Sequence, residues 1–163
     1  MESNTGDEAM TQMKPESAKG NKTKPGDIIA IVLRSDMIAV GIVLHISKRY
    51  RHGILVGYFD RCFSSMEEID VNTLIPQFAF TPNYTSKRIV ELGEWPIIGH
   101  SDVLLSKSSV PILVSVTTLF LKDEIVGQLS SVEETKAYEV LAGQGKVFVE
   151  NRLRSHFEVT KCQ

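Results

Sequence analysis

The sequence predicts a mainly β protein of the α+β class, in which an antiparallel, twisted or barrel-like sheet is followed by one or two C-terminal helices. Three observations lead to this fold class. Short β-branched segments follow one another with turns between them, glycines interrupt several of these segments, and the clearest helix signal lies near the C-terminus. Short strands joined by tight turns are typical of antiparallel meanders, and repeated glycines suit the bends of a small barrel.

Three strands are predicted in the first half of the chain, over residues 27–33, 38–45 and 53–59. The first, DIIAIVL, is apolar at nearly every position, as a strand buried on both faces is. Gly41 lies inside the second, where glycine marks a bulge or the close approach of another backbone. Short turns separate the three segments, so we expect consecutive antiparallel pairing.

The rest of the chain is less regular until it nears the C-terminus. A capped helical turn is predicted at 64–69 and a short strand at 77–80, followed by the cluster LGEWPIIGH at 92–100. Further strands are predicted at 112–116, 119–121 and 125–128.

One helix is predicted to begin at Ser131, because Glu134 follows at the spacing of a capping box. Gly143 supplies its stop, and its apolar stripe consists of Val132, Ala137, Tyr138 and Leu141. For residues 147–156 the pattern fits a second helix, whereas 145–149 also fit a last strand. The sequence does not separate these two alternatives.

Length and composition predict one domain. The chain has 163 residues, of which 42% are hydrophobic and 23% charged, values typical of a globular domain that needs no metal or disulfide to fold. We expect a disordered tail over residues 1–24, where Met and Ala are the only apolar residues, a single β domain over 25–157, and a C-terminal tail over 158–163.

The location that the sequence predicts is cytoplasmic. The N-terminus lacks the apolar core of a signal peptide, and no apolar run approaches the ~20 residues that cross a bilayer. The two cysteines, Cys62 and Cys162, are interpreted as reduced thiols, because Cys162 is the penultimate residue, where a stable bridge is not expected.

No catalytic or cofactor motif is present, so the sequence predicts a protein that is not an enzyme. The histidines, His45, His52, His100 and His156, form no pair at helical spacing, and CxxC and HExxH are absent, so no metal and no cofactor is expected. Cys62 lies near His52 and Asp60 in the sequence, which leaves a thiol hydrolase as a weaker hypothesis, but a small core residue is the preferred interpretation of Cys62.

A basic loop supports a second hypothesis, a small β-barrel that binds nucleic acid. Lys48, Arg49, Tyr50 and Arg51 combine positive charge with an aromatic ring that could stack on a base. The formal net charge of −2 disfavours a nucleic-acid partner, which normally requires a basic excess.

The stronger charge signal is acidic. Between residues 60 and 102, seven acidic residues and three basic ones give a local net charge of −4 in the least regular part of the chain. Irregular loops on a rigid sheet often carry binding sites, and an acidic loop surface suits a basic protein partner. The predicted contact residues are Glu67, Glu68, Asp70, Glu91, Glu94, Trp95 and Asp102.

Two segments resemble the immunity protein 26 family of bacterial toxin systems. The first is KPGDIIAI at 24–31, followed by the glycine-bearing VGIVL at 40–44, and the second is WPIIG at 95–99. The resemblance extends over residues 25–153. One departure is the pair Val32–Leu33, where a proline tends to follow the first apolar strand residues in this family.

The resemblance implies a non-enzymatic antitoxin. Such proteins are encoded beside toxin genes and protect the producing cell by binding the toxin domain, which is a basic nuclease in many systems. The motif residues themselves are expected to serve the fold. Gly26 and Asp27 are expected to form a turn that starts a strand. For Trp95, a buried anchor of the core is the preferred role, and a contact with the partner is the alternative.

Overall fold

Two open sheets carry the fold of residues 22–160, the part of the chain that the computed structural model describes. The strand order is β4-β3-β2-β1-β5 in the larger sheet and β8-β7-β6-β9 in the smaller one. The mainly β prediction is confirmed, but the barrel-like closure is wrong. The edge strands β4 (Asn83–Ser86) and β5 (Ile97–His100) are short and do not pair with each other, and a helix and loops cover the sheet instead.

The centre of the larger sheet is the predicted antiparallel meander. It consists of β1 (Asp27–Arg34), β2 (Met37–Ile46) and β3 (Gly53–Phe63). β4 pairs with β3, and β5 pairs with β1, so residues far along the chain complete both edges. The predicted strand at 77–80 makes only an isolated bridge, between Phe78 and Phe59.

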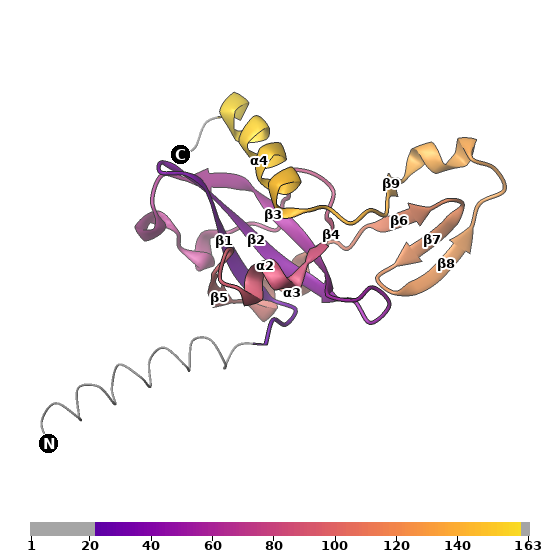
Figure 1. Ribbon diagram of the computed structural model, residues 1–163, viewed down its shortest axis with the longest axis horizontal. Helices are drawn as coiled ribbons and strands as arrows, with labels where there is room; N and C mark the ends of the chain where they lie inside the picture. Colours follow the sequence, from indigo (N-terminus) through magenta and orange to yellow (C-terminus); the bar gives the residue numbers. More distant parts are fainter. Residues whose placement is uncertain (1–21, 161–163) are drawn as a thin grey trace, which may run out of the picture.

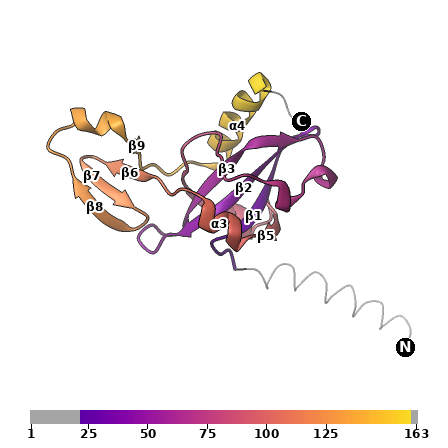
Figure 2. The same cartoon turned by 180° about the vertical axis from the view of Figure 1, so that it is seen from behind.

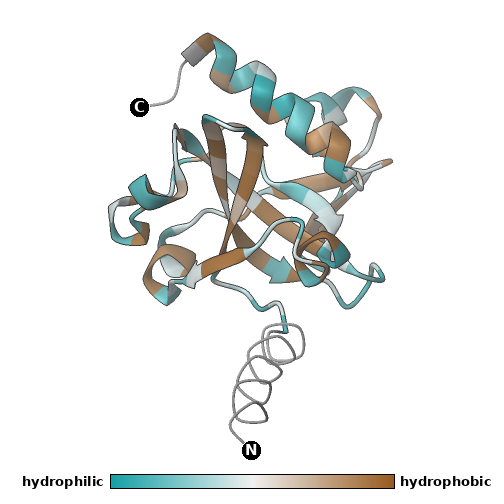
Figure 3. Ribbon diagram, turned by 60° about the vertical axis from the view of Figure 1, so that its left-hand side comes forward, coloured by the Kyte–Doolittle hydropathy of each residue, from teal (hydrophilic) through white to brown (hydrophobic). Residues whose placement is uncertain are grey.

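The larger sheet is buried on both faces, as the apolar pattern of β1 predicts. One face packs against Trp95 and the helix α4 (Lys146–Thr160). The opposite face packs against residues of the β3–β4 connection, of the helix α3 (Asp102–Lys107) and of β6. Figure 3 shows the hydrophobic strands crossing beneath α4, with hydrophilic turns around them. Burial of this kind contributes roughly 25 cal/mol per Å² of apolar surface.

The smaller sheet projects from the main body as a separate lobe (Figure 1). It contains β6 (Ile112–Ser115), β7 (Thr118–Leu121), β8 (Glu124–Gln128) and β9 (Glu139–Val140), and the first three confirm the strands predicted there. β6, β7 and β8 pair antiparallel, whereas β9 pairs parallel with β6.

The helix predicted from Ser131 is wrong. Residues Glu133–Ala137 form only a 3-10 turn, η3, without a side-chain cap, and the chain then enters β9. Val132, the first residue of the predicted apolar stripe, is 71% exposed and does not face a core. Val140 pairs with Val114 of β6, so this part of the chain makes the backbone pairing of a strand instead of that of a helix. Helices gain most of their stability from packing of an apolar face, which is missing here.

The C-terminal segment is helical, which decides between the two alternatives for residues 147–156. α4 buries Val149, Leu153 and Phe157 against the larger sheet, at the spacing of one helix face. The helix continues to Thr160, past residue 158, where the sequence predicts a tail. The predicted N-terminal tail lies outside the described residues except for 22–24.

The Asp123 carboxylate makes one group of the contacts that join the two sheets, beside a hydrogen bond from Asn83 of β4 to the Val140 carbonyl of β9. Asp123, in the β7–β8 turn, accepts hydrogen bonds from Ser47 Oγ (2.6 Å) and the Lys48 N–H (2.8 Å), and it lies 2.9 Å from His45 Nε2. Burial alone would raise the pKa of Asp123, but these hydrogen bonds outweigh it and lower the pKa below its usual value. The β7–β8 turn is thereby fixed to the β2–β3 hairpin, and Figure 2 shows the hairpin loop beside this end of the smaller sheet.

None of the helices formed by residues 22–160 combines the length and the apolar composition that a membrane crossing requires.

Candidate functional site

The two segments that define the family resemblance lie side by side. β1 and β5 pair so that Asp27 faces His100 and Ile28 faces Gly99. The Ala30 N–H also donates to the Pro96 carbonyl (2.9 Å). Gly26 has φ +96°, and a Cβ there would lie 2.6 Å from His100 Cε1, so both its conformation and its neighbour require glycine.

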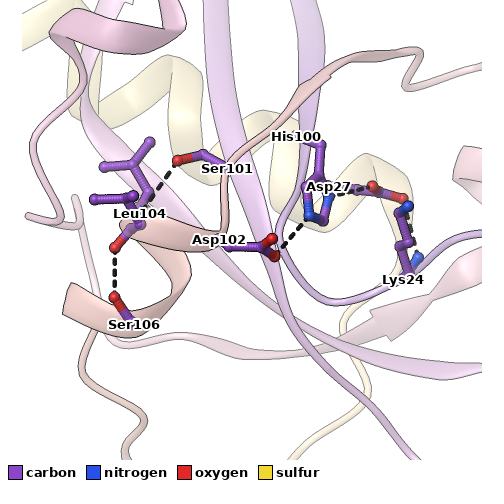
Figure 4. A network of polar contacts seen from close by, with 8 residues as sticks. Lys24, Asp27, His100, Ser101, Asp102, Leu104 and Ser106 are labelled. Carbon is purple, nitrogen blue, oxygen red and sulfur yellow. Dashed lines mark hydrogen bonds and ion pairs between the residues drawn. The ribbon is translucent and has the colours of Figure 1, made fainter.

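Asp27 and His100 form a polar cluster at the start of this strand pair (Figure 4). Asp27 is 4% exposed, and its carboxylate accepts a hydrogen bond from the Lys24 N–H. His100 lies between two carboxylates, with Nδ1 3.0 Å from Asp27 and Nε2 2.8 Å from Asp102. The hydrogen bonds to Asp27 and Asp102 raise the pKa of His100. These motif residues therefore serve the fold, as expected for Gly26 and Asp27.

Trp95 is fully buried, so it is an anchor of the core and is not available as a contact residue. Its Nε1–H donates to Glu150 Oε2 (3.0 Å), and its ring packs edge-on to Tyr58. Lys146 Nζ lies 3.0 Å from the same Glu150 oxygen, which keeps the buried carboxylate paired.

Three of the predicted contact residues lie together on the β3–β4 connection, residues 64–82, which we call the acidic loop. Glu67 and Glu68 lie in the 3-10 turn η1 (Met66–Glu68), and Asp70 caps the next one, η2 (Val71–Thr73), by accepting the Asn72 N–H. All three are exposed, and none forms an ion pair with a described residue. Their negative charge is therefore not neutralised by a neighbouring cation.

Apolar side chains and a cleft lie beside these charges. Met66 and Ile75 of the acidic loop are 41% and 66% exposed. Ile75 lines a cleft of about 330 Å³, together with Phe59, Asp60, Arg61, Leu74 and Gln77. Exposed apolar groups with charges around them are a frequent composition of protein–protein interfaces.

Glu91 and Glu94 do not join this surface. Glu91 is the last residue of the helix α2 (Lys87–Glu91) and Glu94 follows it, and the buried residues of α2 pack on the α4 face of the sheet. Ile69, Val71 and Leu74, the acidic-loop residues next to Glu68 and Asp70, pack on the opposite face. Glu91 also lies among positive charges. Burial and the charges of Arg88, Arg51 and Lys87 lower the pKa of His52, and the negative charge of Glu91 acts in the opposite direction. Asp102 is the first residue of α3, which packs on the same face as Ile69 and Leu74, and it is paired with His100. The acidic run of the sequence is thus divided in space.

The basic loop packs against the smaller sheet. The Lys48 N–H binds Asp123, the Arg49 guanidinium lies 4.6 Å from the centre of the Phe120 ring, and Tyr50 packs edge-on to Tyr84. The aromatic ring that the nucleic-acid hypothesis requires is therefore part of an internal contact, whereas Lys48, Arg49 and Arg51 remain exposed.

Cys62, His52 and Asp60 do not form a catalytic group. His52 precedes β3 and Cys62 lies near its end, so a strand length of roughly 30 Å separates them. Asp60 contacts His156 Nε2 instead, at 2.7 Å. Cys62 is buried, as expected, but the prediction of a reduced thiol is wrong, because Cys62 is disulfide-bonded. Cys162, the other cysteine of the chain, lies outside the described residues.

Sequence comparison agrees with the resemblance carried by these motifs. The family model of immunity protein 26 matches residues 24–121, which is more than half of the chain and includes both β1 and β5. No curated protein and no solved structure shows significant similarity. Membership of such a family supports an immunity role and implies a toxin as the partner. The chain belongs to the immunity protein 26 family.

Proposed function

We propose that this protein neutralises a bacterial toxin by binding it, and that the acidic loop is part of the contact surface. The observation that carries the proposal is the group of exposed, unneutralised carboxylates of Glu67, Glu68 and Asp70, beside the exposed side chains of Met66 and Ile75. Family membership supports the immunity role, and this charge supports a basic partner, such as a nuclease.

The physical role of the carboxylates is to speed association. Negative charge on an exposed loop attracts a basic partner over distances of about one Debye length, which is ~8–10 Å at physiological salt. Such steering raises association rates by roughly tenfold or more. The apolar side chains then supply the part of the interface that excludes water and slows dissociation.

A charge-reversal variant tests this role. Glu67→Lys and Glu68→Lys reverse two charges, and Asp70→Asn removes a third while retaining a side-chain oxygen that can cap η2. The partner is the toxin domain encoded beside this chain's gene. We expect association to be about tenfold slower at low salt, with the difference shrinking as salt is added and with an unchanged circular dichroism spectrum.

The matched control is Glu91→Lys with Glu94→Lys, because these residues are also exposed and acidic but lie with the opposite face of the sheet. A loss confined to the acidic-loop variant supports the proposed surface. Equal losses in both variants would show that net charge alone steers the toxin. Unchanged association rates across the salt series would contradict the electrostatic role, and absence of a complex with the unmodified protein would contradict the proposed function itself.

A further inference from the structure

The structure contains a cavity that the proposed toxin contact does not use. It has a volume of about 410 Å³, which lies in the range of small-molecule sites, and it is found where the residues before β3, the strand β4 and the residues before α4 meet. Its walls are mostly apolar. The lining residues that matter for its chemistry are Tyr50, Arg51, His52, Tyr84, Leu141 and Gln144.

Hydrogen bonds and ring contacts hold the walls of this cavity in place. The segment that joins β9 to α4 runs along the outer edge of β4 (Figure 1). The Gln144 N–H donates to the Tyr84 carbonyl (2.8 Å), and Thr85 Oγ1 donates to the Gln144 carbonyl (2.6 Å). Tyr50 of the β2–β3 hairpin packs edge-on to Tyr84, with the ring centres 5.4 Å apart. The cavity is therefore formed before a ligand enters it.

His52 has two features that the fold does not explain. Its φ is +59°, a left-handed conformation that is uncommon for a residue other than glycine. Its Nδ1 is buried and has no hydrogen-bond partner among residues 22–160. A buried nitrogen without a partner costs free energy, which a bound hydrogen-bonding group would recover. Backbone strain and an unsatisfied polar atom occur together at functional sites more often than elsewhere.

Positive side chains surround His52. Arg51 precedes it in the lining, and Lys87 and Arg88 directly follow Ser86, which also lines the cavity. The Lys87 N–H donates to the His52 carbonyl (2.7 Å), which places the start of α2 beside His52. In the part of the chain that the structure describes, none of these three cations forms an ion pair.

The pKa of His52 reflects the balance of charge around the cavity. Burial lowers this pKa most, and Arg88, Arg51 and Lys87 lower it further, whereas Glu91 acts in the opposite direction. Three cations and one carboxylate leave a local charge of +2. The region around the cavity therefore suits an anion.

The other charges near the cavity are compensated within the protein. Asp123 acts on the Tyr84 hydroxyl, but the β2–β3 hairpin already binds its carboxylate. Lys146, which follows the lining residue Gly145, is paired with Glu150. The first turn of α4 contains no acidic residue, so the positive end of the helix dipole adds to the charge of the three cations.

We propose that this cavity binds a small phosphate monoester whose organic part carries a flat ring. A phosphate monoester has a charge of about −1.5 to −2 at neutral pH, which matches the local charge of +2, and guanidinium groups bind phosphate oxygens in pairs. A carboxylate or a phosphodiester carries only one charge and matches less well. The ring would lie against the apolar wall that contains Tyr50 and Leu141, and His52 would supply a hydrogen bond. This site goes beyond the proposed function, because it requires no toxin.

The test is a calorimetric titration of the full chain with phenyl phosphate, inorganic phosphate and phenol. We expect a dissociation constant below about 1 mM for phenyl phosphate, and at least tenfold weaker binding of the other two, because only phenyl phosphate engages both the cations and the apolar wall. Adenosine monophosphate, a second monoester, repeats the test with a larger ring. In NMR spectra the ring signals of His52 should shift on titration, whereas those of His100, which does not line the cavity, should not.

Substitutions of the cations locate the bound phosphate. Arg51 and Arg88 are exposed and unpaired, so Arg51→Gln and Arg88→Gln should retain the fold. We expect each variant to raise the dissociation constant of phenyl phosphate about tenfold, because each removes a charged hydrogen-bond donor. The matched control is Lys107→Gln, which removes an exposed cation of α3 outside the cavity and should change the constant less than about twofold.

Three results would overturn the inference. The first is that neither phosphate monoester binds, and the second is an equal loss for Arg51→Gln and Lys107→Gln. The third is a single-stranded oligonucleotide without a terminal phosphate that binds more tightly than either monoester, because it would assign the cations to a nucleic-acid backbone. None of these results bears on the toxin complex, so the failure of this site and the failure of the proposed function can be told apart.

Discussion

Removal of the Asp123 carboxylate is the perturbation that most directly tests how the two sheets are held together. Asp123→Ala takes away the acceptor for Ser47 Oγ and the Lys48 N–H and the partner of His45 Nε2. The Asp123 side chain is 20% exposed, so water replaces these partners only in part. With about 1 kcal/mol for each of the three contacts, the free energy of unfolding should fall by roughly 2–3 kcal/mol.

The assay is urea denaturation followed by tryptophan fluorescence, combined with hydrogen–deuterium exchange of β6 and β7. Because Trp95 is the only tryptophan and is buried in the larger sheet, fluorescence reports unfolding of that sheet, whereas exchange also detects release of the lobe. Asp36→Ala is the control, because Asp36 is 72% exposed in a surface ion pair with Arg34 and should cost under about 0.5 kcal/mol.

Acid should have the same effect as the substitution. The pKa of Asp123 is lowered in the folded state, so its contribution is present above the unfolded value of about 3.9 and is lost as the pH falls through the folded pKa. The difference in stability between the unmodified protein and Asp123→Ala should therefore narrow at acid pH. A loss below 0.5 kcal/mol with unchanged exchange in β6 and β7 would refute the role of Asp123 as a stabilising link between the sheets.

Two further predictions concern the core and the motif cluster. Trp95→Ala should cost about 3–5 kcal/mol of unfolding free energy, because it leaves a cavity and removes the indole donor to Glu150. Trp95→Phe removes the same donor but leaves a smaller cavity, so it should cost less; thermal unfolding measures both, and equal losses would argue against the contribution of ring packing. The pKa of His100 is raised by Asp27 and Asp102, so its contribution is present below the unfolded value of about 6.5 and is lost as the pH rises through the folded pKa. Between pH 5.5 and 8 the unmodified protein should lose stability relative to His100→Gln, and parallel curves for the two would contradict this.

The larger sheet was largely predictable because its central strands are local in the sequence. β1, β2 and β3 are β-branched runs joined by short turns, so pattern and pairing follow from neighbours along the chain. β4 and β5 were not predicted as strands: each has four residues, and each is fixed by pairing with a strand far away in sequence. The same reason explains β9, where pairing with β6 replaces the predicted helix.

The candidate site was only partly predictable, because a sequence shows how many charges a region contains but not which face each one occupies. Glu67, Glu68 and Asp70 are neighbours along the chain and therefore remain together in space. Glu91 belongs to the same acidic run, yet α2 carries it to the other face of the sheet. The β8 segment was predicted as a strand, but its exposure follows from the strand order, because no strand within residues 22–160 pairs with its outer side.

By itself the sequence determined the fold class, the central meander, the absence of a catalytic motif and the family, because all of these depend on local periodicity and on short motifs. Tertiary structure decided which strands form edges, that Trp95 is buried, that the basic loop packs against the smaller sheet through Asp123, and how the acidic run is divided. The physical reason is that these features depend on contacts between residues far apart along the chain, and such contacts leave no periodic trace in the sequence.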